Sequence, residues 1–329
     1  MPWKGERDPY KIWISEIILQ QTRVEQGWAY YTRFIATWPT VGQLAKAAQD
    51  DVYKAWEGLG YYSRCRHLIE AAQYINNDLN GRFPARYEDI LLLKGVGAYT
   101  AAAIASFAFD EPRAVVDGNV FRVLARFFGI PTPVDSTEGR KLFTSLANDL
   151  IDPQDPAAYN QAIMDFGAVI CRPMAPLCEA CPLRRACAAY QKGLVTSLPL
   201  KRKMVKVRQR YFNYLIVEQG EFVYMHQRLK KDIWQNLFEF ILVETTGQPQ
   251  EKDILPTSAL EALFSGLPFE VTKISENFLQ KLTHQTISGR FYHITLENSQ
   301  KRLKKYRRVS KKEVSRMALP KFINSYLQD

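Results

Sequence analysis

Residues 91–128 read LLLKGVGAYTAAAIASFAFDEPRAVVDGNVFRVLARFF, and this stretch decides how the chain folds. Its first half predicts a short apolar helix ending near Leu93 and an alanine-rich helix over residues 98–109, with KGVG (residues 94–97) between them. Two glycines this close allow a tight turn beside a ligand, and the second helix presents unpaired amides and a positive dipole end. The pattern favours a phosphate-binding hairpin; the simpler alternative is a helical hairpin in which glycine only makes the turn.

The second half of the stretch places an acid, Asp117, after an apolar pair and before a predicted helix over residues 120–128. Aspartate at this position is typical of an N-cap, which is the structural interpretation. However, LKGVGAYTA followed about 20 residues later by VDGNV resembles the helix-hairpin-helix, Gly/Pro-Asp superfamily of DNA glycosylases. The resemblance implies that Asp117 is catalytic.

Length and composition allow two domains. The chain has 329 residues, 47% of them hydrophobic, which is enough to build a core in each domain. No stretch approaches the roughly 20 apolar residues of a membrane span, and MPWKGERD at the start contains no apolar signal core. We expect a soluble, cytoplasmic protein associated with the nucleoid, without membrane partners. Because Met1 lies so close to the first long helix, we also expect that some upstream sequence is missing.

The net charge of +10 is unevenly distributed. Residues 1–195 contain 21 Lys and Arg against 21 Asp and Glu, whereas residues 196–329 contain 23 against 13. A basic protein fits a nucleic-acid partner. Since the first region has no net charge, DNA binding there has to depend on local geometry.

Residues 8–38 predict one long helix or two abutting helices. Glu16 lies in the most apolar part of this segment. A carboxyl group among isoleucines loses hydration, which raises its pKa and makes it a candidate proton donor near neutral pH. The alternative is a glutamate that faces solvent or pairs with an arginine. The expected core positions are Ile14, Ile17, Ile18, Val24, Trp28, Tyr31 and Phe34.

The sequence WEGLGYYSRCR, residues 56–66, contains a glycine turn directly before Tyr61 and Tyr62. Aromatic side chains next to Arg64 and Arg66 suit contact with stacked bases and phosphates. Adjacent tyrosines are also common in protein cores, so the pattern alone does not distinguish a DNA contact from a core position. Farther along, residues 138–170 predict two more helices that lead directly into a group of cysteines.

Four of the five cysteines lie between residues 171 and 187, interspersed with prolines. In a cytosolic protein, such grouping indicates metal binding rather than disulfides. Four thiolates suit zinc or an iron–sulfur cluster equally well. The spacing of Cys171, Cys178, Cys181 and Cys187 resembles the [4Fe-4S] loop of the endonuclease III and adenine glycosylase branch of the superfamily, which implies a structural cluster, with arginines beside it that meet the DNA backbone.

The periodicity changes after a basic linker at residues 196–208. YFNYLIVEQGEFVYMHQ predicts two strands around Gln219-Gly220, and FILVE, FEVTKI and RFYHITLE predict three more. Residues 209–329 therefore predict an α+β domain, and they resemble the Nudix-like domain of adenine glycosylases. No Nudix metal box is present, so we expect this domain to bind and not to hydrolyse.

Motifs in order along nearly the whole chain resemble the adenine DNA glycosylases of the MutY type: WISEIILQQTRV, WEGLGYYSR, LKGVGAYTA, VDGNV, YNQAIMDFGAVIC and the cysteine loop. The resemblance implies a mainly α helix-hairpin-helix glycosylase domain over residues 1–195 and a Nudix-like lesion-recognition domain. It implies an enzyme, expected to be monomeric, that flips out and removes adenine paired with 8-oxoguanine or guanine in double-stranded DNA. Glu16 falls on the general acid and Asp117 on the acid that stabilises the sugar cation, with Tyr99 and Asn119 as their companions.

The resemblance also implies DNA contacts. Gln161 matches a residue that contacts the extruded adenine, and Gln21 and Tyr61 match residues wedged into the duplex. Thr283 and His284 stand in the loop that reads 8-oxoguanine, where Leu282-Thr283-His284 replaces the usual Phe-Ser-His. From the residues themselves, Gly95, Val96 and Gly97 are expected to bind a DNA phosphate.

The sequence leaves two rival functions. An endonuclease III-like pyrimidine glycosylase with lyase activity uses a lysine at the position of Tyr99 to form a Schiff base, which tyrosine cannot do. We therefore expect a monofunctional glycosylase that leaves an abasic site. A non-catalytic iron–sulfur DNA-binding protein would need neither Glu16 nor Asp117.

Overall fold

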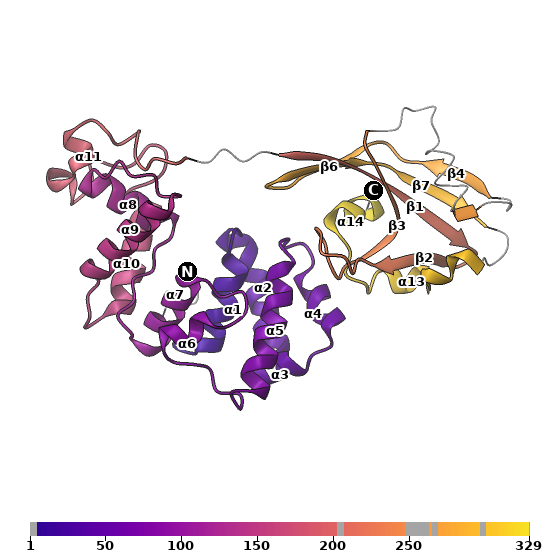
Figure 1. Cartoon of the computed structure of the whole chain (residues 1–329), viewed down its shortest axis with the longest axis horizontal. Helices are drawn as coiled ribbons and strands as arrows, with labels where there is room; N and C mark the ends of the chain where they lie inside the picture. Colours follow the sequence, from indigo (N-terminus) through magenta and orange to yellow (C-terminus); the bar gives the residue numbers. More distant parts are fainter. Residues whose placement is uncertain (1–4, 203–206, 248–262, 265–268, 297–300, 329) are drawn as a thin grey trace. The chain divides into compact units, whose positions relative to one another are not determined.

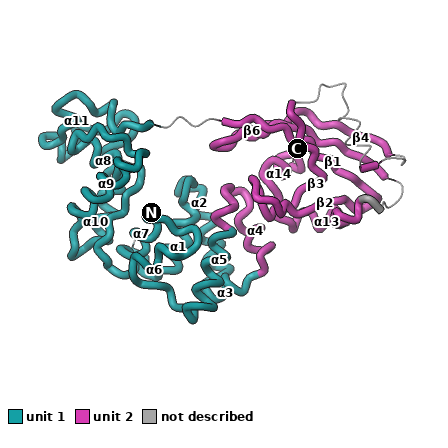
Figure 2. The backbone as a smooth tube through the Cα atoms, in the orientation of Figure 1, with its two compact units in different colours: residues 1–47, 66–204 teal, residues 48–65, 205–329 magenta. Residues whose placement is uncertain are grey.

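The structure is a computed structural model that describes residues 5–202, 207–247, 263–264, 269–296 and 301–328. Its backbone divides into two compact units (Figure 2): unit 1 is residues 1–47 and 66–204, and unit 2 is residues 48–65 and 205–329. None of the helices in these described ranges has the length and apolar composition needed to cross a membrane.

Unit 1 is helical (Figure 1). The three helices predicted from residues 91–128 are confirmed, because glycines and the Asp117 cap mark their ends. The helices are α1 (Pro9–Leu19), α2 (Val24–Thr37), α3 (Val41–Lys46), α5 (Ser63–Asn77, which begins in unit 2), α6 (Tyr87–Leu91), α7 (Ala98–Phe109), α8 (Gly118–Phe128), α9 (Thr137–Leu150), α10 (Pro156–Val169), the 3-10 helix η1 (Arg184–Ala186) and α11 (Ala188–Gln191).

Helix α7 is buried along its middle, with every residue from Thr100 to Ser106 excluded from solvent. Its alanines have small side chains, so neighbouring backbones approach closely, and α7 packs against α1, α6 and α10. This packing brings Tyr99, in the first turn of α7, beside Glu16 on α1.

A second core lies among α8, α9 and α10 and includes Val120, Leu124, Phe143 and Met164. A buried asparagine of α10 fixes the segment that leads to α8. Asn160 accepts a hydrogen bond from the Val115 amide (2.9 Å) and donates to the Arg113 carbonyl (2.9 Å). Asp117 therefore follows a backbone segment that is anchored on both sides of residue 114.

Residues 8–38 form two helices, separated at residues 20–23, where Gln21 has a φ of 60°. The predicted core positions on α1 are buried, as are Tyr31 and Phe34, but Val24 is only half-buried. The prediction for Trp28 is wrong, since this side chain is 41% exposed. Helix α2 buries only a narrow face, and the Trp28 ring stacks on Tyr31 from outside, with ring centroids 5.9 Å apart.

Unit 2 is built around a mixed sheet with the strand order β4-β7-β1-β3-β2-β8; β6 pairs with the first part of β1, and β5 pairs with β6. The long central strand β1 pairs in parallel with β6 and β7 and antiparallel with β2 and β3. The elements are β1 (Arg208–Gln219), β2 (Phe222–Gln227), β3 (Phe238–Thr245), β4 (Glu270–Ile274), β5 (Phe278–Lys281), β6 (Gln285–Gly289), β7 (Phe291–Thr295), η2 (Lys301–Lys305), β8 (Arg307–Ser310), α13 (Lys311–Val314) and α14 (Lys321–Gln328).

The five predicted strands correspond to β1, β2, β3, β4 and β7, so the α+β class of this region is confirmed. Strands β5, β6 and β8 and helices α13 and α14 were not predicted. Of the predicted linker, residues 203–206 lie outside the described residues.

Helix α4 (Gln49–Trp56) and the turn after it belong to unit 2. Hydrogen bonds join this segment to the C-terminal part of the chain. Lys54 Nζ donates to the Met317 carbonyl (2.9 Å), the Leu319 amide donates to Glu57 (2.8 Å), and Asn236 donates to the Tyr53 hydroxyl (2.7 Å). The expected domain boundaries at residues 195 and 208 stay a prediction.

Candidate active site and DNA-binding residues

Glu16 is a buried carboxyl group on α1, with only 5% of its surface exposed. Burial raises its pKa to about 7; the hydrogen bond from the Tyr99 hydroxyl acts in the opposite direction, and the negative charge of Asp117 raises the pKa further. The solvent-facing interpretation of this glutamate is therefore wrong. A carboxyl group with this pKa is partly protonated at neutral pH and is able to donate a proton.

Tyr99 is the hydrogen-bond partner of Glu16. Burial raises the pKa of its hydroxyl well above the usual value, and the neighbouring Glu16 and Asp117 act in the same direction. Tyr99 therefore remains a neutral hydrogen-bond donor, and unlike a lysine it has no amine with which to attack a sugar.

Asp117 is the N-cap of α8, as the structural interpretation predicts. Its Oδ1 accepts hydrogen bonds from the amides of Asn119 and Val120 (both 2.8 Å), and its Oδ2 accepts one from Asn119 Nδ2 (2.8 Å). Three donors therefore satisfy both oxygens of the Asp117 carboxylate at the positive end of the helix dipole. The capping role does not exclude a chemical one, because Asp117 also acts electrostatically on Glu16.

Arg122 was not predicted from the sequence to be a functional residue. Its side chain hydrogen-bonds to Asn119, which in turn donates to Asp117. Its Nη2 donates to Asn119 Oδ1 (2.8 Å) and to the Gly167 carbonyl (2.7 Å), and its Nε donates to the Cys171 carbonyl (2.6 Å). The glycine at position 167 of α10 lets the two backbones lie close together at Asn119, because a Cβ at that position would lie 2.7 Å from the Asn119 Cβ. The available signal was a pair of arginines, Arg122 and Arg126, spaced four residues apart on one face of a largely apolar helix.

A cavity of about 300 Å³ opens at Glu16. Gln161 of α10 lines the same cavity, as do Phe107 and Ile12, whereas Tyr99 and Asp117 are not among its lining residues. The Gln161 side chain donates to Asp165 (3.0 Å), which leaves its amide oxygen available to a bound molecule. The cavity thus combines a proton donor, an aromatic wall and an amide, and its volume is in the range of small-molecule sites.

The loop between α6 and α7 has the geometry that the glycines predict. Gly95 has a φ of +77°, and a Cβ there would lie 2.5 Å from the Cβ of His67, so only glycine fits. Val96 is buried and its amide donates to the Leu93 carbonyl (3.1 Å), which makes it an anchor of the loop and not a free donor. Exposed Gly95 and Gly97, with the first turn of α7, remain to face a ligand.

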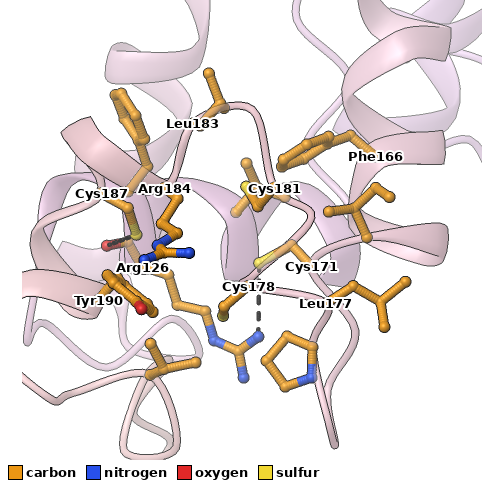
Figure 3. A pocket seen from close by; sticks show the side chains of 15 residues that line it. Arg126, Phe166, Cys171, Leu177, Cys178, Cys181, Leu183, Arg184, Cys187 and Tyr190 are labelled. Carbon is orange, nitrogen blue, oxygen red and sulfur yellow. Dashed lines mark hydrogen bonds between the residues drawn. The ribbon is translucent and has the colours of Figure 1, made fainter.

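The four cysteines line one cavity, shown in Figure 3. Arg126 of α8 is buried beside them and donates to the carbonyl groups of Arg172 (2.7 Å) and Pro173 (3.1 Å), which fixes the start of the loop. The rest of the lining is mostly apolar. Within the described ranges, no three His, Cys, Asp or Glu side chains are arranged to hold a metal ion as they stand. The thiol donor set nevertheless fits zinc or an iron–sulfur cluster. Cys65 is separate and fully buried.

The remaining predicted residues lie on exposed turns. Gln21, in unit 1, is exposed at the break between α1 and α2. In unit 2, Thr283 and His284 form the turn between β5 and β6, and the Tyr61 hydroxyl is hydrogen-bonded to the Thr283 hydroxyl. The structure thus brings together Glu16 with Tyr99 in unit 1, and Tyr61 with Thr283 in unit 2.

Two family models match the chain. Residues 14–148 match the HhH-GPD superfamily base excision DNA repair protein, and residues 213–329 match the NUDIX domain. Among solved structures, the chain is similar to a thermostable thymine-DNA glycosylase, with 34% sequence identity, a TM-score of 0.55, and coverage of 58% of this chain and 88% of that one.

Similar proteins include mammalian adenine DNA glycosylases. The mouse protein is 44% identical over 211 residues, which cover 60% of this chain and 41% of the mouse chain. The rat protein is 33% identical over 351 residues, which cover 90% of this chain and 68% of the rat chain. The similarity includes the Glu16 helix, the Asp117 segment and the C-terminal sheet, and the chain therefore belongs to the adenine DNA glycosylase family of base excision repair enzymes.

Proposed function

We propose that this protein is a monofunctional adenine DNA glycosylase that removes adenine opposite 8-oxoguanine or guanine in duplex DNA, acting as a monomer on chromosomal DNA inside the cell. The proposal rests on the environment of the Glu16 carboxyl group. This group is buried at a cavity, has its pKa raised to about 7 by burial, and accepts a hydrogen bond from Tyr99. A structural glutamate needs none of these three properties.

The residues fit acid-assisted hydrolysis of the N-glycosidic bond. Adenine is a poor leaving group as an anion, so protonated Glu16 donates its proton to N7 of the flipped base as the bond to C1′ breaks. The sugar becomes an oxocarbenium-like cation, which the ionised Asp117 stabilises. Water then adds to C1′ and gives up a proton, which the Glu16 carboxylate takes back, and an abasic site is left. Tyr99 orients Glu16, and Asn119 orients Asp117.

Tyr99 also determines that the reaction ends at base release, without strand cleavage. In the endonuclease III branch, the lysine at this position attacks the sugar and leads to strand cleavage. Tyr99 has no amine and its hydroxyl stays protonated. The product is therefore an abasic strand that breaks only on later treatment with alkali.

We assign lesion reading to exposed residues outside the adenine cavity. The hydroxyl of Thr283 and the ring of His284 can hydrogen-bond to the edge that distinguishes 8-oxoguanine from guanine, and Tyr61 can wedge into the stack beside it. Gln21 has the same wedging role, Gln161 contacts the extruded adenine, and the Gly95–Gly97 turn binds a DNA phosphate. In this proposal, residues 1–195 carry every catalytic residue, and residues 209–329 select the base opposite adenine together with Tyr61 and Gln21.

We further propose that Cys171, Cys178, Cys181 and Cys187 hold a [4Fe-4S] cluster. Their thiols line one cavity with mostly apolar walls, which is the donor set and environment that such a cluster uses. When bound, the cluster supplies a cross-link that holds the loop, and with it Arg172 and Arg184, against the DNA backbone. Elemental analysis of anaerobically purified protein should find iron, whereas stoichiometric zinc would contradict the assignment.

The decisive experiment measures base release from duplexes that differ only in the base opposite adenine. We expect release opposite 8-oxoguanine and guanine, with strand breakage only after alkali. A duplex with an oxidised pyrimidine is the rival substrate, and its cleavage without alkali would support the endonuclease III-like function. Tight binding of all duplexes with no base release would support a non-catalytic DNA-binding protein.

A further inference from the structure

The turn that carries Tyr61 has an unusual backbone. Gly58, Gly60 and Tyr61 all have positive φ values, of 94°, 71° and 46°. Glycine adopts this region freely, but for tyrosine it is strained and persists only where surrounding contacts enforce it. The contacts that enforce it here are therefore candidates for a functional role.

The turn directs two consecutive tyrosines to different places. Tyr62 is buried, stacks on Tyr53 with ring centroids 6.5 Å apart, and accepts a hydrogen bond from the Gly58 amide (3.3 Å). Tyr61 is 41% exposed, with its hydroxyl on Thr283. The Tyr61 ring is therefore accessible to a bound molecule, whereas the Tyr62 ring is part of the core.

Arg64, the second residue of α5, contacts this turn. It is only 9% exposed, and its Nη2 donates to the carbonyl groups of Leu59 (3.2 Å) and Gly60 (3.3 Å). Its guanidinium carbon lies 5.7 Å from the centroid of the Tyr61 ring and 5.2 Å from that of Trp56. One side chain thus contacts the backbone before Tyr61 and the Tyr61 ring itself.

These contacts suit an arginine. A planar guanidinium can donate to two adjacent carbonyls while its flat face lies on aromatic rings, and a lysine ammonium has no such face. Burial lowers the pKa of Arg64 to about 10, so the group still carries its charge at neutral pH. Trp56 adds a second donor to the Gly60 carbonyl (3.1 Å), which makes that carbonyl the fixed point of the turn.

We infer that Arg64 is a positioning residue for lesion recognition, which holds the strained turn so that the Tyr61 ring stands exposed beside Thr283. The inference rests on the proposed function, in which Tyr61 wedges into the duplex. A preorganised aromatic ring loses little conformational freedom on binding, so loosening it weakens the complex with the lesion. Arg64 itself touches neither the base nor the sugar.

A double-mutant cycle tests this inference. Arg64→Gln and Tyr61→Leu are made singly and together, and single-turnover adenine release is measured opposite 8-oxoguanine and opposite guanine. Arg64→Gln should reduce the preference for 8-oxoguanine roughly 5-fold or more, the equivalent of one lost contact. In the Tyr61→Leu background it should change the preference less than about twofold, because its target is already gone. An equal effect in both backgrounds would mean that Arg64 has only a general structural role.

Two further variants are controls for misfolding and for a general effect of removing a positive charge. Arg64→Lys keeps the charge and should show a smaller loss of preference than Arg64→Gln. Arg33 is the matched control, since it also lies over a tyrosine, 4.7 Å from the Tyr30 ring, but on the exposed surface of α2. Arg33→Gln should keep the wild-type preference, and a loss equal to that of Arg64→Gln would overturn the inference.

A readout independent of catalysis separates this inference from the proposed function. In protein labelled with 3-fluorotyrosine, the Tyr61 resonance is identified by its disappearance in Tyr61→Phe. Arg64→Gln should shift or broaden that resonance in the absence of DNA, and an unchanged resonance would overturn the positioning role. If the resonance changes but wild-type protein shows no preference for 8-oxoguanine, the proposed function fails while the structural role of Arg64 stands.

Discussion

Replacement of Glu16 by glutamine should stabilise the protein at high pH and abolish its activity. The side chain keeps its shape, and its amide oxygen still accepts the hydrogen bond from Tyr99, so the fold should be preserved. What changes is the charge, because burial raises the pKa of the Glu16 carboxyl from 4.5 to about 7. The folded state therefore resists ionisation of this group, and glutamine cannot ionise.

The size and sign follow from linkage. Because the folded-state pKa is raised, the stabilising contribution of Glu16 is fully present below pH 4.5 and is lost as the pH rises to about 7. Each pKa unit corresponds to about 1.4 kcal/mol, so the loss is on the order of 3 kcal/mol. Glu16→Gln should match wild type near pH 4.5 and exceed its stability by about 3 kcal/mol above pH 7, a melting difference of roughly 6–12 °C for a unit of this size.

The assay is thermal unfolding at pH 5 and pH 8, paired with base release. Release by Glu16→Gln should fall by at least about 10²–10⁴-fold, and wild-type release should decline as the pH rises through 7, since the proton donor is lost. Glu25→Gln, an exposed position on α2, is the control and should retain the wild-type pH dependence. A stability difference that does not grow with pH would refute the raised pKa, and activity within a few fold of wild type would refute the acid role.

Four further substitutions test the other assignments. Asp117→Asn keeps the acceptor that caps α8, so unfolding free energy should fall by only about 1 kcal/mol while base release collapses. Gly95→Ala places a methyl group against His67 and forces a strained φ, so affinity for undamaged duplex should drop together with stability. Cys178→Ser should lower iron content and DNA affinity without changing the chemistry of base release. Thr283→Val should reduce the preference for 8-oxoguanine over guanine by about 1–3 kcal/mol and spare release opposite guanine.

Each of these predictions has a contradicting result. Equal losses of melting temperature and activity in Asp117→Asn would favour a purely capping role. Unchanged DNA affinity in Gly95→Ala would remove the hairpin from the DNA contact, and Cys178→Ser with full iron content would exclude this cysteine as a ligand. If Thr283→Val slows release equally opposite both bases, Thr283 does not read the lesion.

The helices around the candidate active site were predictable because their signals are local. A glycine pair, an aspartate cap and an alanine run within residues 91–128 determine the ends of α6, α7 and α8. The burial of Glu16 was likewise indicated by its isoleucine neighbours. What local signals could not supply is the contact between α1 and α7 that joins Glu16 to Tyr99, since this depends on packing between segments about 80 residues apart.

The short strands β5, β6 and β8 also lack a clear local signal in the sequence. β5, β6 and β8 have the sequences FLQK, QTISG and RRVS, with only one or two β-branched or aromatic residues each, whereas the equally short β4 (EVTKI) and β7 (FYHIT) have three or more. The error at Trp28 has a different origin. Periodicity finds an apolar face, but it does not show how much of that face a neighbouring helix covers.

Unit 2 contains residues 48–65 as well as the C-terminal part of the chain, and this affects how lesion selection should be tested. Removing residues 196–329 would delete the partners of Tyr53, Lys54 and Glu57, which hydrogen-bond to Asn236, Met317 and Leu319. It would also remove Thr283 from Tyr61. A truncated protein that lost its preference for 8-oxoguanine would therefore not distinguish a missing reader from a disturbed turn. Point substitutions at Thr283 and Arg64 leave the partners of Tyr53, Lys54 and Glu57 in place, and the Arg64 substitution also leaves the Thr283 hydroxyl unchanged, so a loss of preference in Arg64→Gln is assigned to the residue that positions Tyr61 and not to a missing reader.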